Sequence, residues 1–326
     1  MSARPFRRPG RVVPPRAPRQ GGLTLTELMV AMALGLLVTL AAGAMLVSAD
    51  KAYVSQADAA GVDDGGRFAL EAIGRAARQS AFINWGRDEA GPDAAAAPAR
   101  VSGFDAQSLA RDSEGTTGLQ PGVANGSDVL ALRFAGSGAA PDGDGSVLSC
   151  AGFSVSEHDD GWSIFFVAEN AAGETELRCK YHGHDGWSAE ALVAGVDSFQ
   201  VLYGLDTDIP ADGLANRFVS ASEINALDAA LALDGATEAA RTRERYRRTH
   251  WKRVASIKVA LLLHGAHRAR RPDEPVLFEL FGHGYSDSAG EADRGTTVRE
   301  QDMDVSLRER ERQLFGTTIA LRNPSS

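Results

Sequence analysis

One carboxylate in this sequence stands where a charge is costly. Glu27 is the only charged residue between Arg19 and Asp50, and residues 28–47, which follow it, carry no charge at all. An ionised group carried to the middle of a bilayer without a partner costs about 2.5–3.5 kcal/mol. The chemistry that this position suggests is charge pairing, because a cation beside the carboxylate offsets a penalty that either charge would meet alone.

A second group of carboxylates, Asp206, Asp208 and Asp212, follows a predicted strand. Oxygen ligands at alternating positions are typical of a calcium loop, but Ile209-Pro210 interrupts the pattern here. We therefore expect a solvated acidic turn and no metal, with calcium as the alternative. The histidine pairs at 182/184 and 264/267 could contribute metal ligands, but we expect polar, solvated turns there as well.

The two cysteines of the chain are Cys150 and Cys179. Outside the cytoplasm such a pair most simply forms a disulfide, which would close a loop of about 30 residues and stabilise the fold by roughly 3–4 kcal/mol. Two separate thiols are the main alternative, and a zinc site that includes His182 is another.

Catalytic motifs are absent from the sequence. It contains no Gly-x-Ser-x-Gly, no phosphate-binding glycine loop, no dinucleotide fingerprint and no His-Glu-x-x-His. We therefore expect no enzyme, no cofactor and no small-molecule substrate. The formal net charge is −9, and removal of the six arginines in residues 1–22 makes it −15. This balance disfavours non-specific binding to nucleic acid, which depends on Lys and Arg at the phosphates.

The elements that must position Glu27 begin with the apolar stretch. Residues 28–47 are about 20 residues, which is long enough to cross a bilayer as a helix. The six arginines before the stretch favour the cytoplasm for that side, so the chain after Val47 should face outward. A signal peptide cleaved near residues 47–49 is the alternative, although its apolar region would normally span about 7–15 residues. A plain membrane anchor is another.

Helical spacing resumes after the span, with Leu70, Ile73 and Ala77 on one face of residues 67–79. We predict one long helix from about residue 23 to residue 80, weakened at its glycines. Residues 85–127 are predicted to be an irregular connection with one short strand near Val101. Helical periodicity returns in residues 221–250, and residues 284–312 are predicted to be loop. Alternating apolar segments between Gly/Asp turns predict strands at residues 128–134, 147–155, 162–168, 175–181, 197–203, 251–263, 275–281 and 314–321.

Gly22 followed by Leu-Thr-Leu-Thr-Glu-Leu-Met-Val-Ala resembles the processing site of type IV prepilins and pseudopilins. The resemblance implies cleavage after Gly22 and methylation of the new amino terminus at Leu23. It also implies that Glu27 acts in assembly, by neutralising the terminal amine of a neighbouring subunit. Leu23 replaces the usual phenylalanine, and Thr26 replaces an aliphatic residue.

Further stretches are similar to minor pilins of the PilW type: one after the span at residues 66–82, one at residues 199–204 and one near the end at residues 256–323. The resemblance implies an α+β fold, in which a long N-terminal transmembrane and amphipathic helix packs on an antiparallel β-rich domain. The expected parts are a cleaved leader (1–22), the helix (23–82, span about 28–47) and the globular domain (83–326).

The implied function is that of a minor pilin. It would be processed by prepilin peptidase, reside in the inner membrane with its C-terminal domain outside the cytoplasm, and then join the pilus. Its partners would be other minor pilins and the major pilin, in a complex that starts pilus assembly. A type II secretion pseudopilin is one alternative, and an anchored or secreted binding module outside any filament is the other.

Overall fold

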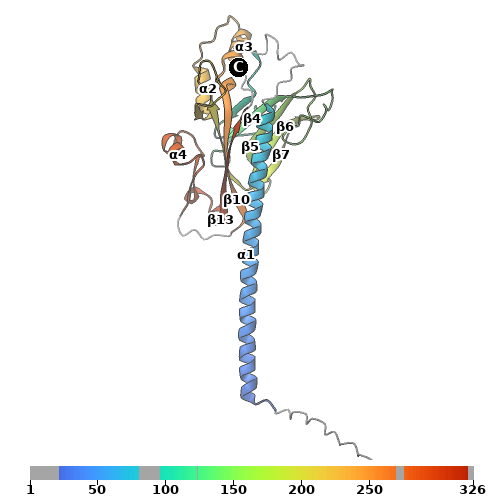
Figure 1. Cartoon of the computed structure of the whole chain (residues 1–326), viewed down its shortest axis with the longest axis vertical. Helices are drawn as coiled ribbons and strands as arrows, with labels where there is room; N and C mark the ends of the chain where they lie inside the picture. Colours follow the sequence, from blue (N-terminus) through green and yellow to red (C-terminus); the bar gives the residue numbers. More distant parts are fainter. Residues whose placement is uncertain (1–21, 81–95, 123, 269–274, 322–326) are drawn as a thin grey trace, which may run out of the picture. The chain divides into compact units, whose positions relative to one another are not determined.

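The computed structural model describes residues 22–80, 96–122, 124–268 and 275–321 of the chain (Figure 1). The chain divides into two compact units, residues 1–53 and 54–326. Of the predicted leader, residues 1–21 lie outside the described residues. Each unit is described below by itself.

Helix α1 (Leu25–Ser80) continues through Gly61, Gly65 and Gly66, which confirms the predicted single long helix. Gly66 has a packing role, since a Cβ built there would lie 2.4 Å from the ring of Phe315. Glycine therefore lets the helix approach this aromatic side chain closely, a use that the sequence pattern alone did not reveal.

Two antiparallel sheets make up most of the second unit. The first has the strand order β1-β4-β5-β6-β7 and the second β13-β10-β8-β9, while β2–β3 and β11–β12 form small ladders. The first sheet consists of β1 (Val101–Phe104), β4 (Val129–Ala135), β5 (Asp160–Glu169), β6 (Thr175–Gly183) and β7 (Gly186–Ala194). The second consists of β8 (Val196–Leu205), β9 (Arg217–Val219), β10 (Val254–Arg268) and β13 (Arg310–Ala320).

Shorter elements lie in the connections between strands of the same sheet. The two small ladders are built from β2 (Gln107–Leu109), β3 (Leu119–Pro121), β11 (Leu277–Glu279) and β12 (Thr297–Arg299). The helical elements are α2 (Ala221–Ala229), α3 (Glu238–Arg248), η3 (His250–Arg253), α4 (His283–Ala289), η4 (Glu300–Asp302) and α5 (Val305–Arg308). A long apolar helix followed by an antiparallel β domain confirms the predicted α+β class.

The core of the second unit joins the last turns of α1 to both sheets. Ile73 and Ala77 are fully buried, as their helical spacing predicted, and they belong to one cluster with Phe165 of β5 and Phe199 of β8. Every residue of β8 is buried, which fits a strand covered on both faces.

Several local predictions are wrong. The described part of residues 85–127 contains three strands, β1, β2 and β3, where one short strand was expected. Residues 147–155 do not form a strand but a turn closed by a single bridge between Leu148 and Ser154, and Gly152 has a φ of 84° that suits glycine. Residues 284–312 are not simply loop, because α4, β12, η4 and α5 lie within them. Strand β7 was not predicted, and most of its side chains are only partly buried or exposed.

Candidate assembly site and acidic loop

Glu27 lies in the first turn of α1, at the third helical position after Thr24. The Thr24 backbone N–H and the Thr24 hydroxyl both donate to the same Glu27 carboxylate oxygen, each at 2.9 Å. A negative side chain in the first turn also interacts favourably with the helix dipole. The structure therefore gives Glu27 a local function in starting the helix, which the Thr-x-x-Glu spacing could have indicated.

Gly22 and Leu23, which flank the predicted cleavage point, are both exposed. A side chain at Gly22 would meet no other atom within 4 Å. The peptide bond between them is thus open to an enzyme in the part of the chain that the structure describes.

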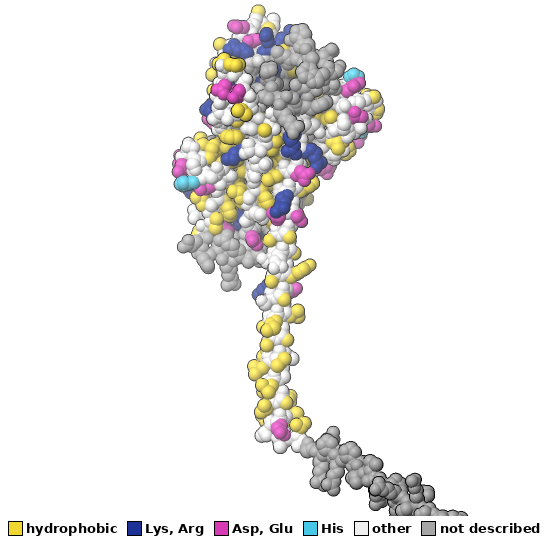
Figure 2. Space-filling model, in the orientation of Figure 1, with side chains coloured by type: hydrophobic (Ala, Val, Ile, Leu, Met, Phe, Trp, Pro, Cys, Tyr) yellow, Lys and Arg dark blue, Asp and Glu magenta, His cyan; other side chains and the backbone are white. Residues whose placement is uncertain are grey.

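The segment of α1 that follows is long and apolar enough to cross a membrane, and none of its most apolar window is buried inside the protein. Figure 2 shows hydrophobic side chains gathered along this exposed segment. Its one hydroxyl-bearing residue between Leu28 and Val47 is Thr39, whose Oγ1 donates to the carbonyl oxygens of Gly35 and Leu36 at 3.1 and 2.9 Å. Because its partners lie in the same helix, the hydroxyl is satisfied without water, as a polar group in apolar surroundings must be.

Cys150 and Cys179 form a disulfide, as predicted, with their Cα atoms 6.0 Å apart. The bond joins β6 to the turn at residues 149–152, which replaces the predicted strand. It thereby excludes the alternatives of two separate thiols or a zinc site at this pair.

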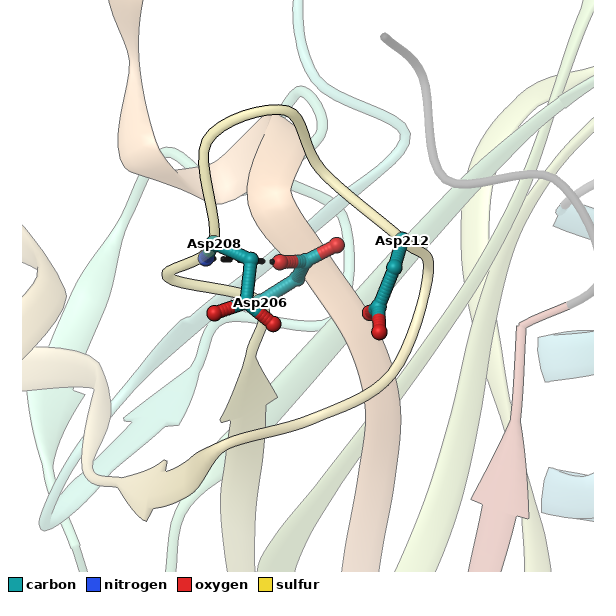
Figure 3. Close-up of side chains that lie close together, drawn as sticks. All are labelled: Asp206, Asp208 and Asp212. Carbon is teal, nitrogen blue, oxygen red and sulfur yellow. Dashed lines mark hydrogen bonds between the residues drawn. The ribbon is translucent and has the colours of Figure 1, made fainter.

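The three aspartates of the acidic loop do come together, with ligand atoms within 4.8 Å of one another (Figure 3). Asp206 is buried, and its two carboxylate oxygens accept from the backbone N–H groups of Asp208 (3.0 Å) and Gly213 (2.7 Å). The Gly213 N–H is the main cause that lowers the Asp206 pKa, and the nearby Arg253 adds to it. Asp208 and Asp212 are exposed.

The hydrogen bonds to Asp206 hold the loop in this conformation without a bound ion. Asp212 accepts from the Leu214 N–H at 2.8 Å, and Asp208 accepts from the Asn216 side chain at 3.0 Å. The oxygens would suit a hard cation such as calcium, which takes six to eight oxygen ligands. However, the N–H groups that these oxygens already accept from explain why the three aspartates lie close together. We therefore interpret the loop as an acidic turn.

The histidines do not all lie in solvated turns. His182, His184 and His267 are exposed, but only His184 lies in a turn, since His182 is on β6 and His267 is on β10. The His264 side chain is only 1% exposed. That part of the prediction is wrong, because His264 lies on β10, where its Nδ1 is 3.0 Å from the buried Asp197.

Two family models match the chain. Residues 17–43 match the prokaryotic N-terminal methylation motif, and residues 164–323 match the Type IV Pilus-assembly protein W family, PilW. No curated protein and no solved structure matches the chain. The first match covers Gly22, Leu23 and Glu27, and the second covers the sheets from β5 to β13.

Proposed function

We infer that this chain, a prepilin-like protein of the PilW type, is a minor pilin that is cut between Gly22 and Leu23 and takes part in starting type IV pilus assembly. The observation that carries the proposal is the presence in one chain of the methylation motif at residues 17–43 and the PilW match at residues 164–323. Neither family is a known enzyme class, and the mechanism is insertion into a filament rather than chemistry.

The geometry at the start of α1 supports this mechanism. Cleavage after Gly22 would leave Leu23 as the new terminus and would keep the Thr24–Glu27 hydrogen bonds intact. A mature subunit would then offer both charges of the assembly pair, an amine on Leu23 and a carboxylate on Glu27. In a bundle of apolar helices, each charge is stabilised by the opposite charge of a neighbouring subunit.

The proposed location follows from the same elements. The chain would cross the inner membrane once, with the β domain outside the cytoplasm, and would move from there into the pilus. Its proposed partners are prepilin peptidase, the major pilin and other minor pilins. The PilW match favours the pilus over a type II secretion pseudopilin, which shares only the N-terminal motif.

N-terminal sequencing of the mature protein tests the proposal. Methylated Leu23 is the expected terminus. A terminus at Asp50 would indicate a cleaved signal peptide, and Met1 or Ser2 a plain anchor; either result would overturn the assignment. Counting surface pili and secreted enzymes in a deletion strain separates the pilus from the secretion system, since we expect loss of pili with normal secretion.

A further inference from the structure

A cleft of about 550 Å³ opens beside the buried ring of His264. It is lined by the turn between β5 and β6, the start of β8, the His264 position on β10, and residues 302–310. Its volume falls in the range of about 300–1,000 Å³ that is usual for ligand sites.

The backbone fixes the ring at this cleft. The His264 N–H donates to the Gly195 carbonyl oxygen at 2.8 Å, and the Gly195 N–H donates to the Thr175 carbonyl oxygen at 2.8 Å. Gly195 has a φ of 76°, and a Cβ there would lie 2.6 Å from the His264 carbonyl oxygen. The approach of these segments therefore depends on glycine.

The charges behind the ring decide which nitrogen carries the proton. One oxygen of Asp197 accepts from Arg312 Nε at 2.7 Å, and the other lies 3.0 Å from His264 Nδ1. Arg312 is also 3.3 Å from the buried Glu300. A carboxylate paired with a guanidinium only accepts hydrogen bonds, so Nδ1 carries a proton; in the neutral form of the imidazole, Nε2 is then an acceptor.

That acceptor has no hydrogen-bond partner among the described residues, although it is buried. The nearest charged atom is Glu174 Oε1, at 3.9 Å, which is too far for a hydrogen bond and is itself an acceptor. Buried polar atoms nearly always have a partner. The two facing acceptors thus call for a donor that enters between them from the cleft.

The charges of the described lining residues favour a positively charged donor. Among the described residues that line the cleft, Arg310 is the one arginine or lysine, and it is 3.5 Å from Glu174. The carboxylates outnumber it; they belong to Glu169, Glu174, Asp197, Asp302 and Asp304. A nitrogen with two N–H groups, placed about 2.9 Å from both Nε2 and Oε1, would satisfy both acceptors.

We propose that this cleft binds a primary ammonium or a guanidinium group, as carried by a lysine or arginine side chain of a partner polypeptide or by a small free amine. His264 Nε2 and Glu174 receive its N–H groups, and the surrounding carboxylates balance its charge. The site is independent of Glu27 and of the cleavage at Gly22.

The test uses the full chain in detergent micelles with ¹⁵N-labelled histidine. The variant His264→Gln assigns the His264 ring signals among those of the seven histidines. The probes are the peptide acetyl-Ala-Lys-Ala-amide, the same peptide with uncharged norleucine in place of lysine, and n-butylamine. We expect the lysine peptide to shift the Nε2 signal saturably and the norleucine peptide to leave it unchanged.

Matched variants separate the site from general charge. Glu174→Gln should weaken binding of the lysine peptide by about tenfold, the loss of one charge-assisted hydrogen bond, whereas Glu291→Gln, at an exposed position outside the cleft, should not. Tighter binding of the peptide than of butylamine assigns the site to a partner side chain, and equal binding assigns it to a small amine. Equal response to both peptides, no response, or a response to Zn²⁺ alone would overturn the proposal.

Discussion

Thr24 and Glu27 exchange hydrogen bonds across the first turn of α1. The Thr24 backbone N–H donates to the Glu27 carboxylate at 2.9 Å, and the Glu27 backbone N–H donates to the Thr24 hydroxyl at 3.3 Å. This reciprocal pair is a capping box, which satisfies two N–H groups that a helix start otherwise leaves unpaired. Glu27 thus has two functions that mutations can separate, one in capping the helix and one in offering a negative charge.

Replacement of Glu27 by Gln separates the two functions. Gln can keep the capping box but carries no charge, so we expect Glu27→Gln and Glu27→Ala to insert in the membrane and to be equally defective in pilus assembly. Thr24→Ala loses the cap, worth about 0.5–2 kcal/mol, but keeps the charge, and we expect a milder defect. Quantifying sheared surface pili measures the outcome, and normal piliation of Glu27→Gln would reject the charge-pairing mechanism.

Replacement of Gly22 by Asp should block processing. A side chain at position 22 meets no atom within 4 Å, so the fold itself tolerates the change and any effect arises at the peptidase. The expected result is accumulation of the longer precursor on an immunoblot. Gly35→Ala, also with nothing within 4 Å, serves as the control and should be processed normally. A mature band of normal size from Gly22→Asp would refute the cleavage site.

Replacing either of two glycines of α1 by alanine should change the stability of the fold, in opposite directions at the two positions. In Gly66→Ala the new methyl would lie 2.4 Å from the ring of Phe315, a side chain only 8% exposed, so overpacking should destabilise the fold by about 1–3 kcal/mol. In Gly61→Ala nothing lies within 4 Å, and the better helix propensity should stabilise it by about 0.5–1 kcal/mol. Denaturant unfolding in micelles measures both. If the two variants shift stability in the same direction, the close approach of α1 to Phe315 does not require glycine at position 66.

Removal of the disulfide should weaken the β domain. Cys150 and Cys179 are separated by 29 positions, and closing such a loop contributes roughly 3–4 kcal/mol in the chain-entropy model. We expect the double variant Cys150→Ser/Cys179→Ser to melt at a lower temperature than the native protein. Reductant should lower the melting temperature of the native protein and leave that of the double variant unchanged. Equal melting temperatures in all four samples would show that the bond does not contribute.

Local sequence patterns predicted those elements in which buried side chains recur at a regular spacing along the chain. Phe199, Val201 and Tyr203 alternate and predicted β8, and Ile73 and Ala77 predicted the buried face of α1. The capping box was not predicted, although the Thr-x-x-Glu spacing of Thr24 and Glu27 could have indicated it. The assembly role of Glu27 rests on the family resemblance, because nothing inside one chain shows which neighbour it meets.

Contacts between distant residues escaped prediction for a physical reason. His264 is buried because Asp197, 67 positions earlier, accepts from its ring, and periodicity carries no information about such a pair. The turn around Cys150 looked like a strand because its apolar residues are spaced as in one. The helices α4 and α5 have 7 and 4 residues, too few for a period to be recognised within a charged segment.

A buried carboxylate gives the β domain a pH dependence that can be measured. Tyr285 donates its hydroxyl to Asp293 Oδ2 at 2.8 Å, while Oδ1 has no partner among the described residues. Burial is the main cause that raises the Asp293 pKa to about 6, and the carboxylates of Asp105 and Glu223 raise it further, against the lowering effect of the Tyr285 hydrogen bond.

The folded protein therefore favours the protonated form of Asp293. Its stabilising contribution is complete below the ordinary pKa of 3.8 and is lost as the pH rises through about 6. Asn keeps an acceptor for Tyr285 but cannot ionise, so Asp293→Asn should be more stable than the native protein at pH 7.5, by on the order of 2–3 kcal/mol. The difference should shrink as the pH falls to about 4. Glu291→Gln, which removes an exposed carboxylate, is the control and should leave the slope between these pH values unchanged. Parallel stability curves for Asp293→Asn and the native protein, measured by denaturant unfolding, would show that this carboxyl is not the titrating group.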